Sequence, residues 1–115
     1  MAACVEVVVT GPEPEWAADL ARVLVEERLI ACAHIYPEMR SVYHWQGQIE
    51  DVPEARLAMH TRADLVEALT ARVVDLHEYG VPCIMAMPIV GGLPAYLDWV
   101  AEQTREAGPR ELAHS

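Results

Sequence analysis

The sequence contains no lysine, and its 8 basic residues, all arginine, stand against 18 acidic residues, so the formal net charge is −10. The arginines form no cluster along the chain. Nucleic-acid binding requires a basic patch that neutralises phosphates, so nucleic acid is not expected as a partner. An acidic surface is compatible with affinity for cations, although it more often serves solubility alone.

Cysteine is scarce as well. Cys4, Cys32 and Cys83 are odd in number, widely separated and form no C-x-x-C pair. This pattern disfavours both a disulfide framework and a structural zinc site. The first residues, MAACVEVVV, lack the charged start and the cleavage site of a secretory signal. We therefore expect a reducing, cytoplasmic setting.

Charge is absent from residues 80–97, a run that approaches the length of a membrane-spanning helix. Prolines and glycines interrupt this run, and a continuous helix cannot pass through them. The run instead predicts a buried, central strand at about 83–90, followed by a turn. No membrane partner is expected.

Motifs that carry catalysis are missing too. The chain has no GxSxG, HExxH or GxGxxG motif, and Gly91-Gly92 is followed by Leu93-Pro94 instead of a phosphate-binding lysine or serine. A nucleophile pair of Cys32 or Cys83 with His77 would depend on folding alone, and no pattern indicates it. We therefore expect no enzymatic activity.

The chain does contain a regular succession of strand-like and helix-like segments. The hydrophobic periodicity predicts strands over 3–10, 30–49, 54–61 and 83–90, and helices over 14–29, 61–77 and 94–106. Pro37 predicts a bend or bulge in the second strand, and the polar stretch EDVPE (50–54) predicts the turn to the third. The order β-α-β-β-α-β with a terminal helix predicts an α+β, ferredoxin-like fold. Residues 1–106 would form one domain, with a flexible tail over 107–115.

The stretch SVYHWQGQIE (41–50) has the alternation of a half-buried strand. In such a strand Tyr43, Trp45 and Ile49 share one face, and His44 points the other way. In this fold the helices over 14–29 and 61–77 cover one face of the sheet, so the other face must be covered by something else. We expect the aromatic face of this strand to pack against a neighbouring subunit. Trp16 and Trp99, at apolar positions in helices, are expected in the core.

Cys32 and His34 lie two residues apart on a predicted strand, so their side chains share a face. Thiolate and imidazole together suit Cu(I) or Zn(II), which makes the pair a possible chelate. The alternative is that Cys32, between two alanines, is an ordinary small core residue.

Five stretches resemble the CutA family, the divalent-cation tolerance proteins. They are LVEERLIACAHI (24–35), SVYHWQGQIE (41–50), HTRADL (60–65), HEYGVP (77–82) and MPIVGGLPAYLDWV (87–100). They occur in order from about residue 5 to 105. The resemblance implies a non-catalytic homotrimer in which long hairpins extend the sheets across interfaces, with copper or another divalent cation as ligand. It places Tyr43, Trp45 and Tyr79 at an inter-subunit cleft.

The resemblance also suggests metal ligands. His77 is the histidine kept in a family loop tied to metal binding, and with Cys32 it forms our predicted metal set. Alternatively, His77 only interacts with the dipole at the end of the second helix. The family loop usually reads HPYEVPE, whereas this chain has HEYGVPC (77–83), with Gly80 and Cys83 in place of two glutamates.

Two further family positions differ. His60 replaces a lysine that is common in the family, and Val9 replaces a metal-linked cysteine that some members carry. An alternative function is a trimeric signalling or small-ligand module like the nitrogen-signalling proteins, by analogy of fold. Those proteins use a long mobile loop, and the predicted turn here is short.

Overall fold

The computed structural model describes residues 3–108 and has the predicted order of elements. These are β1 (Cys4–Gly11), α1 (Pro14–Glu26), β2 (Cys32–Trp45), β3 (Gln48–Arg62), the short 3-10 helix η1 (Ala63–Leu65), α2 (Val66–Leu76), β4 (Ile84–Pro88) and α3 (Pro94–Gln103). The strands form one antiparallel sheet in the order β2-β3-β1-β4. The expected α+β class is therefore confirmed.

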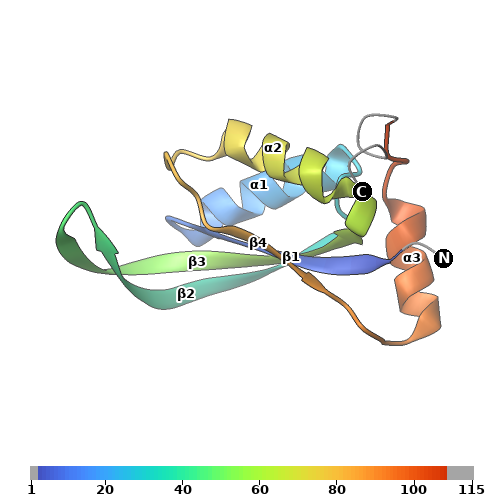
Figure 1. The fold of residues 1–115 in the computed structure, drawn as a ribbon, viewed down its shortest axis with the longest axis horizontal. Helices are drawn as coiled ribbons and strands as arrows, with labels where there is room; N and C mark the ends of the chain where they lie inside the picture. Colours follow the sequence, from blue (N-terminus) through green and yellow to red (C-terminus); the bar gives the residue numbers. More distant parts are fainter. Residues whose placement is uncertain (1–2, 109–115) are drawn as a thin grey trace.

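Helices α1 and α2 cover one face of the sheet, and α3 packs across one end of it (Figure 1). The core between the sheet and the two helices comes from alternate strand residues and from helix positions with a 3.6-residue period. Its fully buried members include Val7, Val9, Leu24, Leu57, Met59, Leu69 and Val73. Burial of each such side chain contributes about 1.5–3 kcal/mol, so this layer is the main source of stability.

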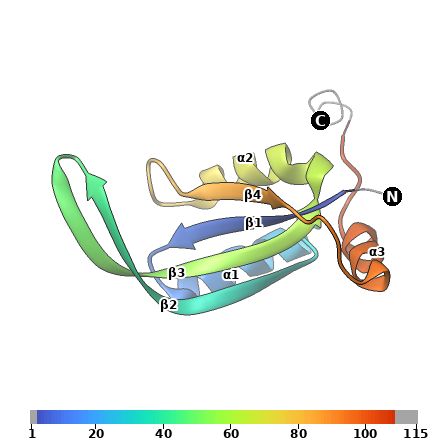
Figure 2. The same cartoon turned by 60° about the horizontal axis from the view of Figure 1, so that its bottom comes forward.

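The β2–β3 hairpin turns earlier than predicted, because its turn is Gln46-Gly47 and not 50–54. Both turn residues have positive φ, 50° for Gln46 and 78° for Gly47, as in the two-residue turns that match the twist of hairpin strands. Residues 50–54 instead continue β3. The ribbon extends well past the ends of β1 and β4 (Figures 1 and 2).

The corrected turn changes which side chains share a face of the ribbon. Ile49 pairs with His44, and Gln48 pairs with Trp45, so Ile49 lies on the face of His44. The prediction that Ile49 accompanies Tyr43 and Trp45 is therefore wrong. The bulge predicted at Pro37 is confirmed, since the register of β2 against β3 shifts between Tyr36 and Met39.

Strand β4 lies at the edge of the sheet beside β1, not in its centre as predicted. Met85 is 54% exposed and Met87 37% exposed. The apolar sequence of β4 is typical of a strand covered on both faces, but within the described residues only Ile84 of β4 is partly buried. Trp99, expected in the core, is likewise 40% exposed, whereas Trp16 packs partly buried against the core.

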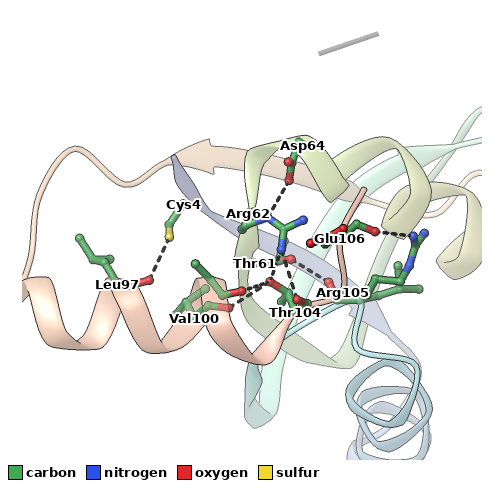
Figure 3. Close-up of polar contacts among 11 residues, drawn as sticks. Cys4, Thr61, Arg62, Asp64, Leu97, Val100, Thr104, Arg105 and Glu106 are labelled. Atoms are coloured by element: carbon green, nitrogen blue, oxygen red, sulfur yellow. Dashed lines mark hydrogen bonds and ion pairs between the residues drawn. The ribbon is translucent and has the colours of Figure 1, made fainter. Parts of the chain in front are cut away.

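Helix α3 is anchored to the sheet by a buried arginine (Figure 3). Arg62 donates to the backbone oxygen and the hydroxyl of Thr104, at 3.2 and 3.1 Å, and to Asp64 at 2.9 Å. The Cys4 thiol faces the backbone oxygen of Leu97 at 3.7 Å. These contacts hold α3 in place across one end of the sheet.

All three helices are shorter than expected. Helix α2 covers only Val66–Leu76 of the predicted 61–77, because 61–62 belong to β3 and 63–65 form η1. Helix α1 ends at Glu26, because Arg28 takes a left-handed φ of 58°, and α3 ends at Gln103. The expected tail, 107–115, falls mostly outside the described residues, which end at 108. Within residues 3–108, no helix has the length and apolar character needed to cross a membrane.

Candidate metal centre

Three metal-binding side chains converge on the face of the sheet that α1 and α2 leave open. The ligand atoms of Cys32, His34 and His60 all lie within 4.8 Å of one another. Cys32 and His60 are paired across β2 and β3, and His34 lies two residues along β2 on the same face. The strand register therefore builds the cluster from residues that are distant in sequence.

The separation of two of these ligands already suits a shared metal ion. Cys32 Sγ lies 3.7 Å from His60 Nδ1. A zinc ion with bonds of about 2.3 Å to sulfur and about 2.0 Å to nitrogen holds such atoms roughly 3.5–3.8 Å apart. His34 is exposed, and its ring meets the His60 ring edge-on with 5.6 Å between centroids. A small rotation of the His34 side chain would bring its nitrogen into range.

Glu6 orients His60 within the cluster. Glu6 is the β1 partner of His60, and its Oε1 lies 3.1 Å from His60 Nε2. The Nε2–H donates to this carboxylate, which leaves Nδ1 as the acceptor nitrogen on the side of Cys32 and Tyr96. In metal sites, a histidine ligand commonly donates its other ring N–H to a carboxylate, which fixes the orientation of the ring.

Tyr96, from α3, closes one side of the cluster. Its hydroxyl donates a hydrogen bond to His60 Nδ1 and lies 3.2 Å from Cys32 Sγ. Burial raises the pKa of Tyr96, and the hydrogen bond with Cys32 raises it further, so the phenol keeps its proton at neutral pH. The hydroxyl therefore lies beside the candidate metal ligands in its protonated form. A bound metal ion would have to displace its hydrogen bond to His60.

The donor set fits a soft or borderline ion. One thiolate and two imidazoles are the ligands that Cu(I) and Zn(II) prefer, whereas Mg²⁺ and Ca²⁺ require oxygen. The prediction that Cys32 and His34 share a face is confirmed by this geometry. His60 and Glu6 were missed as members of the cluster, although Glu6 is the one charged residue of β1, which is a usable signal.

The structure does not bring His77 to this cluster. His77 is 8% exposed, and both ring nitrogens are engaged: Nε2 donates to Thr10 O at 2.8 Å, and Nδ1 accepts from the Tyr79 N–H at 3.1 Å. Thr10 lies four residues along β1 from Glu6, roughly 13 Å at the rise of a strand. The predicted pair of His77 with Cys32 is thus separated, and His77 has no free nitrogen for a metal ion.

In the described part of the chain, the other positions that the family resemblance links to metal binding do not form a set of metal ligands with His77 either. Val9 is fully buried in the core below the helices, and Cys83 is exposed. His77 itself follows the last residue of α2, and its ring packs on Trp16 with 4.5 Å between centroids. Its role in this chain is to tie the end of α2 to β1.

Tyr43, Trp45 and Tyr79 do come together, and they do so within a single chain. They line a cavity of about 530 Å³ between the β2–β3 hairpin and the loop from α2 to β4. The Tyr79 hydroxyl donates to Glu54 Oε2 at 3.0 Å. Burial, followed by this hydrogen bond, raises the pKa of Tyr79 to about 12.

The fold and the donor cluster thus define an α+β protein with an antiparallel sheet that carries a candidate cation centre on its open face. The profile of the family described as CutA1 divalent ion tolerance protein matches residues 4–103. The chain therefore belongs to the CutA1 divalent ion tolerance family.

Curated relatives support this membership. The divalent-cation tolerance protein CutA of Thermus thermophilus is 44% identical over 98 residues, covering 85% of this chain and 95% of the relative. The chloroplastic CutA proteins of Arabidopsis thaliana and Oryza sativa are each 43% identical, over 86% and 88% of this chain. The chain spans only 54% and 57% of the length of these two plant relatives.

Solved structures agree with the fold. The crystal structure of CutA1 from Oryza sativa superposes with a TM-score of 0.90 at 40% identity, covering 92% of this chain and 97% of that chain. The Cut A1 protein of Thermus thermophilus gives a TM-score of 0.85 at 42% identity, over 89% and 99% of the two chains.

Proposed function

We propose that this divalent-ion tolerance protein holds one soft metal ion per chain at Cys32, His34 and His60, without catalysing a reaction. The observation that supports the proposal is the convergence of these three donors, with His60 Nδ1 3.7 Å from Cys32 Sγ and His60 Nε2 held by Glu6. The names of the family and of its Thermus thermophilus member refer to tolerance of divalent cations, which agrees with a protein that sequesters an ion.

Each residue has a distinct part in the proposed centre. Cys32 supplies the negative charge, since the thiolate is the form that binds metal. Glu6 holds His60 in the correct tautomer, and the exposed His34 closes the set. A bound Cu(I) or Zn(II) ion would be sequestered here, because soft ligands hold such ions firmly. The net charge of −10 would favour the approach of cations.

We also propose that the chain acts as a homotrimer in the cytoplasm. The long β2–β3 ribbon exposes apolar side chains, with Val42 63% and Ile49 70% exposed, and β4 leaves a free sheet edge in the single chain. Such features call for a partner strand. The hairpin turn is only two residues long, so it offers no long loop for the alternative of a signalling module.

Titration of the reduced, metal-free protein with Zn(II), and with Cu(I) against a competing chelator, tests the metal centre. We expect binding of one ion per chain, and we expect Cys32→Ala and His60→Ala to weaken it by at least roughly tenfold. Cys83→Ala and His44→Ala are the matched controls, because both residues are exposed elsewhere, and they should leave the affinity unchanged. Equal loss in the control variants would reject the assignment.

A further inference from the structure

The cavity beside the hairpin has the size and the walls of a small-ligand site, and it is distinct from the metal centre. Its volume of about 530 Å³ falls within the range of small-molecule pockets, roughly 300–1,000 Å³. The metal centre lies at the level of Glu6 on β1, whereas this cavity lies at the level of Thr10, toward the other end of that strand.

Aromatic rings form much of the cavity wall. Tyr43 and Trp45 lie two residues apart on β2 and so share a face, and Tyr79 approaches from the α2–β4 loop. Tyr43 is 41% and Trp45 45% exposed. Within residues 3–108 neither ring is stacked on another ring.

The charge inside the cavity is negative. Glu54 is only 6% exposed, and its Oε2 accepts from Tyr79; its Oε1 makes no hydrogen bond within the described residues. The neighbours that act on Tyr79, namely Glu54, Tyr43 and Glu78, all raise its pKa, as negative charges do. Among residues 3–108 no arginine lines the cavity, and the chain has no lysine.

We propose that this cavity binds a small organic cation of the alkylammonium class. The face of an aromatic ring attracts a cation through its quadrupole, and the attraction is largest where water is excluded. A single buried carboxylate, that of Glu54, supplies the opposite charge. Glu54 would therefore pair with the cationic head, and Tyr43, Trp45 and Tyr79 would surround its alkyl groups.

Choline and its neutral isostere, 3,3-dimethylbutan-1-ol, provide the test, with binding to metal-free protein measured by calorimetry in the presence of EDTA. We expect choline to bind at least roughly tenfold more tightly than the isostere. Trp45→Leu should weaken choline binding about fivefold and Glu54→Gln about tenfold, by loss of a ring and of the charge. Trp99→Leu is the matched control, because Trp99 is similarly exposed but lies on α3, and it should change nothing.

Several results would overturn the proposal: no choline binding, equal binding of the isostere, or full affinity in both Trp45→Leu and Glu54→Gln. Light scattering on each variant separates a loss of ligand contacts from a change in assembly, and Glu54→Gln tests the charge without removing a ring. The variant Cys32→Ala, His60→Ala should retain choline binding. Failure of the metal centre and failure of the organic-cation site would therefore be told apart.

Discussion

His60 and Glu6 face each other across β3 and β1, with the imidazole Nε2 3.1 Å from a carboxylate oxygen. This contact decides which ring nitrogen points toward Cys32. Without the carboxylate, the ring would be free to turn or to place its proton on Nδ1, and Nδ1 would then no longer offer its lone pair beside Cys32.

Removal of the orienting carboxylate should weaken the metal centre without touching its ligands. We expect Glu6→Ala to lower the affinity for Zn(II) about 10–100-fold, which is the usual effect of losing such a partner. The measurement is competition with a chelator of known affinity. Glu50→Ala on the hairpin is the control, and an unchanged affinity in Glu6→Ala would contradict the assigned role.

His77 should matter for stability and not for metal. In His77→Gln the contacts to Thr10 and Tyr79 and the packing on Trp16 are weakened, so we expect a loss of about 1–3 kcal/mol in the free energy of unfolding. Urea denaturation measures this loss, and the chelator assay should show unchanged affinity for Zn(II). The reverse outcome, intact stability with lost affinity, would restore His77 as a ligand.

The buried Arg62 should contribute more to stability than an exposed arginine. Arg62→Ala removes the two hydrogen bonds to Thr104 that anchor α3 and leaves Asp64 without its partner, so we expect a loss of about 2–4 kcal/mol. Arg40→Ala breaks the exposed ion pair with Asp51 and should cost much less, since solvent screens such pairs. Thermal and urea unfolding provide the comparison, and equal losses would contradict the anchoring role of Arg62.

Tyr79 should make stability fall at alkaline pH. Its pKa is raised from 10.0 to about 12 in the folded chain, chiefly by burial, so the unfolded chain releases the proton first. The stabilising contribution is complete below pH 10 and is lost as the pH rises toward 12. In Tyr79→Phe this decrease in stability between pH 10 and 12 should disappear. Urea unfolding between pH 9 and 12 measures it, and the exposed Tyr36→Phe is the control.

The hairpin should control assembly. We expect the protein to have the mass of a trimer by light scattering, and we expect Val42→Glu to reduce that mass, since it places a charge in the apolar surface of the ribbon. Val74→Glu is the matched control, because Val74 is similarly exposed but lies on α2. A folded monomer in the unmodified chain would reject the proposed assembly.

The order of elements was predictable because each segment has a clear local period. The position of the hairpin turn was not. Residues 50–54 contain proline and acidic residues and so suggest a turn, but Gln46-Gly47 takes the positive φ angles that a two-residue turn requires. Long pairing between β2 and β3 then stabilises residues 50–54 as strand, against their local preference.

The candidate centre was half predictable. Strand alternation alone places Cys32 and His34 on one face, whereas His60 joins them through a register between residues 28 apart in sequence. The expected role of His77 depended on resemblance to a family loop. In the folded chain the backbone of Thr10 and Tyr79 occupies both nitrogens, and no local pattern reveals such long-range hydrogen bonds.

The amino-acid sequence by itself determined the alternation of strands and helices, the acidic character and the family, because these depend on local periodicity, composition and linear motifs. Tertiary structure alone decided which polar side chains meet. Pairing of β1 and β2 with β3 places Glu6 and Cys32 beside His60, and docking of α3 adds Tyr96. The physical reason is that strand register and helix docking are set by burial of the whole core, and a metal centre inherits its geometry from them.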